Sequence, residues 1–284
     1  MLLKTAIEDR LASLLRSGGS KKTVTFYRFW LSDLAGSLLL TDLESVTLTQ
    51  LRAWSDRLIG RGLAVRSRIG AVASIKSFFK WCLKERLITA DPSERLEKPG
   101  KPKQLPQALD ISEVLALINA CAHSKDPVRD LAILMLLVET GIRAGELVGL
   151  TLDRVHVDAR FVTVIGKTGE RFSFFEESTQ FALRAWLKIR PVGGETLFGL
   201  GVTGVRMMLK RLAVLAHIDP KRIHAHVFRH TSVVLRIENG AEAADLMNIY
   251  GWSSPAMIGV YGQLATERMK ARSMASSPMS RLNR

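Results

Sequence analysis

Three histidines and an arginine fall within seven positions of one short run, HAHVFRHTSV at residues 224–233. His226 and His230 stand at i, i+4 spacing, so on a helix they share a face and suggest a metal site. The glutamate of an HExxH motif is missing, and Arg229 between the two histidines would repel a cation. Metal binding is therefore disfavoured, and ordinary core or surface histidines would explain the run if the rest of the chain offered nothing more.

Cutting a DNA strand without a metal ion requires a particular set of side chains. The scissile phosphate carries negative charge that fixed cations must stabilise in the transition state. Arginine suits this task because its planar fork matches two phosphate oxygens, which lysine cannot do. A hydroxyl group must attack, and an acid must protonate the departing oxygen. The set is therefore two arginines, a lysine or histidine acid, and one reactive hydroxyl.

The chain offers a candidate for each of these roles. Arg143 lies in ETGIRAGELVGL, where apolar neighbours predict partial burial and an unpaired charge would be costly. Arg229 begins a helix that continues into the apolar VVL and raises the same question. Lys167 lies in GKTGE, which predicts the tip of a hairpin. Tyr261 is one of three tyrosines in the chain and follows Gly259 in a short late segment.

The bulk composition favours a folded protein that binds a polyanion. The chain has 284 residues, enough for about two domains. Its 41 Lys and Arg against 27 Asp and Glu give a formal net charge of +14, which favours nucleic acid as a partner. No run approaches the ~18 apolar residues of a membrane span. Cys82 and Cys121 lack CxxC spacing, so an intracellular, cytoplasmic protein without a disulfide framework is expected.

Residues 1–98 are predicted to form an all-helical domain. The segment VRSRIGAVASIKSFFKWCLKERL places an apolar stripe on one side of a helix, and the stripe consists of Ile69, Val72, Ile75, Phe79 and Leu83. Its other faces carry four candidate DNA contacts, namely Arg66, Arg68, Lys76 and Lys80. A solvated basic face and a surface for the DNA backbone are about equally supported. The stretch EKPGKPKQLPQ has a linker composition, and the linker is assigned to residues 99–108.

Residues 109–284 are predicted to form a mixed α/β domain. Asp110 and Glu113 form a capping box before a helix, and a strongly apolar helix follows in PVRDLAILMLLVETG. Three candidate strands, RVHV, RFVTVIG and RFSFF, predict one small antiparallel sheet. The pattern is helical again from Glu176 onwards. GLGVTG matches GxGxxG but lacks the surrounding βαβ unit, so a loop before a helix explains it better than a nucleotide site.

Four segments together resemble the boxes of the tyrosine recombinase, or phage integrase, family. TGIRAGELVGL resembles its first box, VIGKTGERF its lysine-bearing hairpin, and HVFRH its His-x-x-Arg-His box. YGWSSPAMIGVYGQ resembles the final box, in which a His or Trp precedes the tyrosine by nine residues. The resemblance is Xer-like and covers nearly the whole chain. It implies a mainly α fold, with an N-terminal helical-bundle (SAM-like) core-binding domain and a catalytic domain that carries a small three-stranded antiparallel sheet.

The resemblance also implies a role for each site residue. Arg143 and Arg229 would clamp the scissile phosphate, and Tyr261 would attack phosphorus to give a 3′-phosphotyrosyl enzyme. The remaining catalytic residues would be Lys167 as general acid, His226 as a hydrogen-bond or proton-transfer group, and Trp252 as an indole N–H donor. Glu146 and His230 would support the site. Trp252 stands where His is usual and Tyr250 where Leu is usual, and Tyr250 is expected to be a packing residue.

The implied reaction needs no metal, cofactor or ATP, because the phosphotyrosyl link conserves the phosphodiester bond energy. The implied partners are a specific double-stranded DNA site and further copies of the chain, four in a synapse, with room for a second recombinase or accessory proteins. The tail after Tyr261 would dock on a neighbouring subunit, with Leu264 and Met269 as an apolar anchor. Two alternatives stay open: a type IB-like topoisomerase with the same chemistry, and a DNA-binding protein whose catalytic residues are vestigial.

Overall fold

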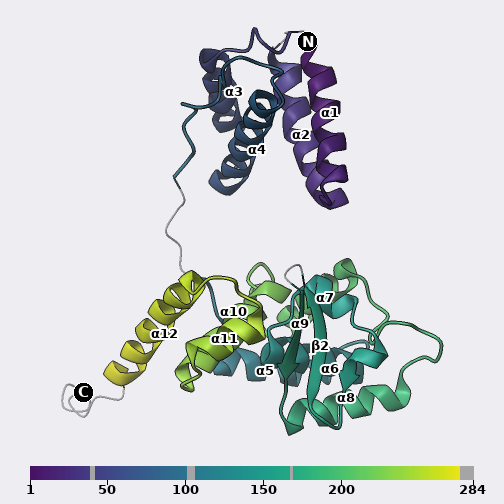
Figure 1. The fold of residues 1–284 in the computed structure, drawn as a ribbon. Coiled ribbons are helices and arrows are strands. Elements are labelled where there is room, and N and C mark those ends of the chain that lie inside the picture. Colours follow the sequence, from purple (N-terminus) through teal and green to yellow (C-terminus); the bar gives the residue numbers. More distant parts are fainter. Residues whose placement is uncertain (39–41, 101–105, 167–168, 276–284) are drawn as a thin grey trace. The chain divides into compact units, whose positions relative to one another are not determined.

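The computed structural model describes the chain except for residues 39–41, 101–105, 167–168 and 276–284, and it describes only the backbone of 271–275 (Figure 1). The chain divides into two compact units, Met1–Gln104 and Leu105–Arg284. None of the described helices is long and apolar enough to cross a membrane.

The described part of the N-terminal unit is helical and contains α1 (Leu3–Arg16), α2 (Lys21–Leu38), α3 (Leu48–Gly60) and α4 (Val65–Lys84). Helix α3 begins where the Thr47 side chain accepts a hydrogen bond from the Gln50 backbone and Gln50 reciprocates, which satisfies two N–H groups at the helix start. The predicted stripe on α4 was wrong at Leu83, which is 40% exposed. Phe78 and Cys82 are buried instead, because the α-helical rotation places them beside Ile75.

The C-terminal unit is mostly helical. Its described helices are α5 (Ile111–Cys121), α6 (Pro127–Thr140), α7 (Ala144–Val148), a 3₁₀ turn at Leu152–Arg154, α8 (Glu177–Ile189), α9 (Val202–Leu215), α10 (Ala225–Glu238), α11 (Ala243–Tyr250) and α12 (Ala256–Ala275). The apolar helix α6 is buried on most sides, as its sequence predicts, and it packs against α8 and α10 (Figure 1). It ends at Gly141, whose left-handed backbone (φ 58°) stops the helix.

The predicted sheet is confirmed. Strands β1 (Val155–His156), β2 (Phe161–Gly166) and β3 (Gly169–Phe174) form an antiparallel sheet in the order β1-β2-β3. Gly166 pairs with Gly169, so the two strands flank Lys167 and Thr168 on both sides.

A separate apolar cluster joins the last three helices. Its buried members are Val233, Val234, Leu246, Tyr250, Tyr261 and Ala265. Through this cluster α12 packs on α10 of its own chain, and Leu264 lies against it whereas Met269 is 55% exposed. The side chains of Tyr250 and Tyr261 are therefore both buried.

Candidate active site

Arg229 is a buried charge near the start of α10. Helix α10 begins at His224, whose Nδ1 accepts a hydrogen bond from the Val227 backbone N–H over 3.1 Å. The apolar residues that follow draw this face of the helix into the core, so Arg229 is only 2% exposed. Its two terminal nitrogens donate to the backbone oxygens of Gly141 (3.0 Å) and Tyr250 (2.6 Å). The predicted burial of Arg229 is confirmed.

The environment of Arg229 is electrostatically unfavourable to a second cation. Burial, together with the positive charges of Arg143 and Arg171, lowers the pKa of Arg229 to about 10. The guanidinium therefore stays charged at neutral pH, but without a carboxylate as a direct hydrogen-bond partner among the described residues. An anion that reached this group would relieve the repulsion and would gain a strong, weakly solvated interaction.

Arg143 lies at the start of α7, and its side chain is 44% exposed. More than half of the side chain is thus covered, in line with the partial burial that its apolar neighbours predict. Its backbone is extended just before the first helical turn, so the chain buries Ile142 and Leu147 while part of the arginine side chain stays exposed. Glu146 holds it from both ends: Oε2 accepts from the Arg143 backbone N–H and Oε1 from its guanidinium, each over 2.8 Å.

Glu146 also binds a second arginine that the sequence analysis missed. Arg171 on β3 donates to both carboxylate oxygens of Glu146, over 3.1 Å and 2.7 Å, and its Nε donates to the backbone oxygen of Ile249 over 3.0 Å. The side chains of Glu146 and Arg171 are each only 8% exposed. Burial alone would raise the pKa of Glu146, but the hydrogen bonds from Arg171 and Arg143 outweigh it and lower this pKa.

Apolar alternation in the sequence would have placed Arg171 on the exposed face of its strand, which is why the residue was missed. In the strand GERFSF the expected alternation of apolar-inward and polar-outward residues is inverted. The charged Arg171 and the polar Ser173 are buried, whereas Phe172 and Phe174 are more than half exposed. An inward charge on a strand needs a buried partner of opposite sign. Glu146 of TGIRAGELVGL is this partner, and it meets Arg171 only in the folded chain.

The hairpin next to this ion pair carries the predicted general acid. Lys167 itself lies outside the described residues. Gly166, the last residue of β2, lies so close to the ion pair that an added Cβ would be 3.0 Å from the Arg171 guanidinium and 3.2 Å from Glu146. Gly166 is thus packed directly on Glu146, which holds Arg143, and on Arg171, which holds Glu146.

Tyr261 on α12 is 1% exposed, and its hydroxyl oxygen lies 2.5 Å from Nδ1 of His230. Burial raises the pKa of Tyr261 to about 12, against a smaller opposing effect of the positive charge on Arg229. The indole ring of Trp252 stacks on the Tyr261 ring, with centroids 5.5 Å apart and planes inclined by 10°. The structure therefore brings Trp252, Tyr261, His230 and Arg229 into one region.

The two histidines that share a face have different surroundings. The His226 ring meets the His230 ring edge to face at 4.7 Å, and His226 is the more exposed of the two. Burial, followed by the charges of His226, His224 and Arg229, lowers the pKa of His230 to about 4. His230 is therefore neutral near pH 7. Of the two histidines, it is His230, predicted as a supporting residue, that contacts the Tyr261 hydroxyl.

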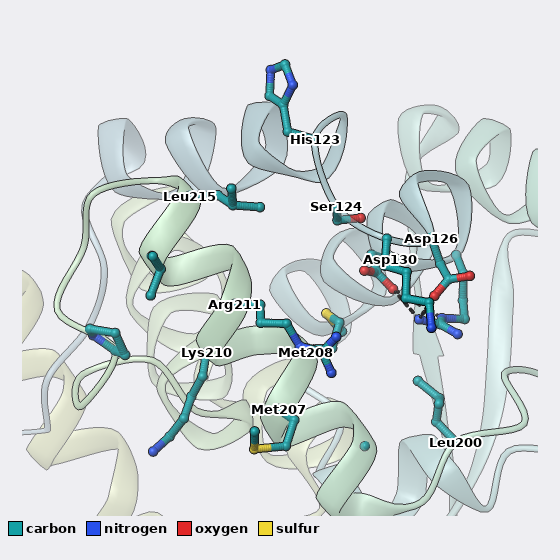
Figure 2. A pocket seen from close by; sticks show the side chains of 15 residues that line it. His123, Ser124, Asp126, Asp130, Leu200, Met207, Met208, Lys210, Arg211 and Leu215 are labelled. Atoms are coloured by element: carbon teal, nitrogen blue, oxygen red, sulfur yellow. Dashed lines mark hydrogen bonds and ion pairs between the residues drawn. The ribbon is translucent and has the colours of Figure 1, made fainter.

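Two further features lie apart from these residues. The described part of the chain contains no group of three or more His, Cys, Asp or Glu side chains placed to hold a metal ion. A groove of about 610 Å³ lies between α9 and the loop from α5 to α6 (Figure 2). Met207, Met208 and Leu200 form part of its lining, and an ion-pair cluster of Arg129 with Asp126 and Asp130 lies at its edge. None of the described candidate catalytic residues lines it.

The four candidate DNA contacts on α4 differ in availability. Arg66 and Lys80 are exposed. Lys76 donates to the backbone oxygens of Glu94 (2.8 Å) and Leu96 (2.9 Å), and Arg68 donates to an oxygen of the preceding loop. Arg66 and Lys80 are consequently the stronger candidates.

Comparison with known proteins shows the family to which the chain belongs. A family model described as the phage integrase family matches residues 107–268. Tyrosine recombinase XerC of Corynebacterium efficiens is 34% identical and covers 93% of this chain and 88% of its own. Tyrosine recombinase XerD of Proteus mirabilis is 31% identical, with 93% and 90% covered. The chain belongs to the phage integrase family, and its enzyme class is the tyrosine site-specific recombinases.

Solved structures show the same fold at low sequence identity. The Tn1549 transposon integrase, solved in complex with a circular intermediate DNA, has a TM-score of 0.77 and 18% identity, and the match covers 94% of this chain and 99% of that one. The XerH site-specific recombinase bound to its palindromic difH substrate has a TM-score of 0.76 and 15% identity, with 93% and 81% covered. The predicted fold class is thereby confirmed.

Proposed function

We propose that this chain cleaves and rejoins double-stranded DNA at a specific site through a covalent link between Tyr261 and a 3′ phosphate. The observation that carries the proposal is one region in which a buried Arg229, without a carboxylate as hydrogen-bond partner among the described residues, interacts electrostatically with a buried Tyr261 hydroxyl. A guanidinium in a water-poor site is suited to an anion, and a tyrosine hydroxyl beside it is suited to attack that anion.

In the proposed reaction, Arg229 and Arg143 bind the nonbridging oxygens of the scissile phosphate. Glu146 orients Arg143 through the two hydrogen bonds described above. His226 and the indole N–H of Trp252 add hydrogen bonds to the same phosphate. The cationic groups stabilise the charge of the five-coordinate transition state, which is where an electrostatic site contributes most.

The bond changes are balanced without a metal ion or ATP. The Tyr261 oxygen forms a bond to phosphorus and passes its proton to Nδ1 of His230, which lies 2.5 Å away, and the bond from phosphorus to the 5′ oxygen breaks. Lys167 protonates that leaving oxygen. Attack of a 5′ hydroxyl from a partner strand on the phosphotyrosine reverses these steps and releases Tyr261, so the phosphodiester count is conserved.

A local movement must precede attack. Tyr261 is 1% exposed and its ring is stacked under Trp252, so a DNA phosphate cannot reach its hydroxyl in this conformation. Helix α12 has to shift relative to α10 for the reaction to begin. We assign the described arrangement to a resting state.

Further parts of the proposal concern the assembly. The domains are assigned as a DNA-clamping domain at 1–98, a linker at 99–108 and a catalytic domain at 109–284, which is consistent with the division into two compact units. Four copies would act together on two DNA sites. The chain after Tyr261, which in the resting state packs on α10 of its own chain, would dock on a neighbour once α12 has shifted. A cytoplasmic location is supported by two buried cysteines that are both free thiols.

The two alternatives are less well supported. A topoisomerase would use the same side chains, but the relatives at 31–34% identity are named recombinases. A vestigial DNA-binding protein would not need to keep a buried arginine and a buried tyrosine hydroxyl, both of which cost folding free energy.

Covalent trapping tests the proposal. Purified protein is mixed, without added metal, with nicked duplexes from DNA that flanks its gene, and the products are separated on a denaturing gel. Wild type and Tyr27→Phe should form a protein–DNA adduct, and Tyr261→Phe should form none. An adduct that persists in Tyr261→Phe places the nucleophile elsewhere, and no wild-type adduct on DNA that the protein binds contradicts the proposal. Relaxation of a plasmid without any exchange between two sites would favour the topoisomerase.

A further inference from the structure

Tyr250 is the last residue of α11, at a position where the resemblance expects leucine. It is fully buried, and it contacts Arg229 twice. Its backbone oxygen accepts from the Arg229 guanidinium over 2.6 Å, and the centre of its ring lies 5.0 Å from the guanidinium carbon. A cation near an aromatic ring face is attracted by the ring quadrupole, most strongly where water is excluded. A leucine could supply the carbonyl but not this attraction.

The hydroxyl of Tyr250 is tied to the helix that carries Arg229. It lies 2.7 Å from the Ser232 hydroxyl, which donates its own proton to the backbone oxygen of Glu139 over 3.1 Å. Since Ser232 has one proton, Tyr250 must be the donor in the first bond. Ser232 follows Arg229 by three residues on α10, so it is one turn further along the same helix face. Tyr250 is thus held at its backbone, its ring and its hydroxyl.

The backbone of Gly141 completes the fit. Its oxygen accepts the second hydrogen bond from Arg229, over 3.0 Å. A Cβ at this position would lie 2.6 Å from Cε1 of Tyr250, a distance that side chains do not tolerate. Glycine therefore lets the tyrosine ring approach the same backbone segment that binds the arginine.

The ring of Tyr250 also belongs to an aromatic stack that ends at the proposed nucleophile, Tyr261. Tyr250 stacks with Trp252 at a centroid distance of 5.2 Å and an angle of 28°, and Trp252 stacks with Tyr261 in turn. The contacts run without interruption from the Arg229 guanidinium through two aromatic rings to the Tyr261 ring. Any shift of Tyr250 would therefore move the arginine relative to the hydroxyl that attacks.

We propose that Tyr250 is a positioning residue for Arg229, which fixes the direction in which the buried guanidinium meets the scissile phosphate. The proposal rests on the proposed function. Tyr250 does not touch substrate and is not the nucleophile, because its hydroxyl is committed to Ser232 in the interior. It acts through the hydrogen bond, the ring contact and the stack described above.

The test compares single-turnover cleavage by wild type, Tyr250→Leu and Tyr250→Phe on two suicide substrates. One has a normal scissile phosphate, and the other has a neutral methylphosphonate at the same place. Tyr250→Leu should cleave the normal substrate about tenfold more slowly than wild type, with DNA affinity unchanged, because the ring attraction is lost. On the methylphosphonate, which lacks the charge that Arg229 binds, the difference between variant and wild type should nearly vanish. Tyr250→Phe keeps the ring and should show a smaller deficit with the same dependence on charge.

A double-mutant cycle with Arg229→Ala provides the second measurement. If Tyr250 acts through Arg229, then adding Tyr250→Leu to Arg229→Ala should slow cleavage by less than about threefold more. An equal deficit on both substrates, or additive effects in the cycle, would overturn the proposal. If Tyr250→Leu fails to fold, Tyr250→Phe decides the question by the presence or absence of the charge-dependent deficit. If wild type cleaves neither of the two substrates, the proposed function is contradicted instead.

Discussion

The Nδ1 atom of His230 lies 2.5 Å from the hydroxyl oxygen of Tyr261. Because burial and neighbouring positive charges lower the pKa of His230 to about 4, its ring is neutral near pH 7 and can accept a hydrogen bond. The tautomer with its proton on Nε2 then orients the tyrosine O–H toward Nδ1. This contact gives the second histidine of HVFRH a direct relation to the proposed nucleophile.

His230→Gln should slow the first cleavage about 10- to 100-fold, because the hydroxyl loses its acceptor and its orientation. The measurement is single-turnover cleavage of a substrate whose 5′ bridging oxygen is sulfur. A thiolate leaves without protonation, so this substrate should restore Lys167→Ala but not His230→Gln. His123→Gln, at an exposed histidine, is the matched control. Restoration of His230→Gln by the sulfur substrate would assign His230 to the leaving-group side and contradict this prediction.

The stability of the protein should fall as the pH drops from about 6.5 toward 4. The pKa of His230 is lower in the folded chain than its ordinary value of 6.5, so the unfolded chain binds more protons in this window. His230 is surrounded by His224, His226 and Arg229 on its own helix and by Tyr261 on α12, and His224 also has a pKa lowered by burial. Urea unfolding at pH 7 and pH 5 measures the change. His230→Gln should lose less stability between these two pH values than wild type, and an equal loss would contradict the assignment.

Arg171→Met should destabilise the protein by about 3 kcal/mol, since it leaves the buried carboxylate of Glu146 without its main partner. Arg184→Met breaks an exposed ion pair with Asp158 and is the control, with no resolvable change expected. Urea unfolding of the full chain gives both values. Cleavage by Arg171→Met should also fall, because Glu146 would orient Arg143 less firmly. Equal stability of the two variants would show that the buried pair contributes nothing beyond an exposed one.

Gly141→Ala should cost about 2 kcal/mol, from a left-handed backbone and from contact with the Tyr250 ring. Gly199→Ala separates the two causes, because Gly199 has nearly the same φ (61° against 58°) but open space around its Cβ. It should cost about 1 kcal/mol, from the backbone alone. The difference between the two unfolding free energies reports the contacts of the added methyl group, the shortest with Tyr250 and a looser one with Ser232. If the difference is zero, the ring moves aside without cost and does not hold the Gly141 segment.

The sequence by itself determined the elements and the composition of the site. Helix periodicity, the capping box at Asp110 and the glycine-bounded hairpin are local signals, and the corresponding helices and strands are present. The spacing of the boxes selected Arg143, Arg229, Trp252 and Tyr261 before any distance was known. Local backbone preferences and the order of residues along the chain are sufficient for such predictions.

Only the tertiary structure decided which of these side chains meet and which are buried. The pairing of Arg171 with Glu146, the two carbonyl acceptors of Arg229 and the contact of His230 with Tyr261 all join residues at least 21 positions apart. The multiple contacts of Tyr250 were likewise not evident from its neighbours in sequence. Such contacts depend on the direction of each side chain after the helices pack, and packing is a property of the whole core rather than of any local pattern.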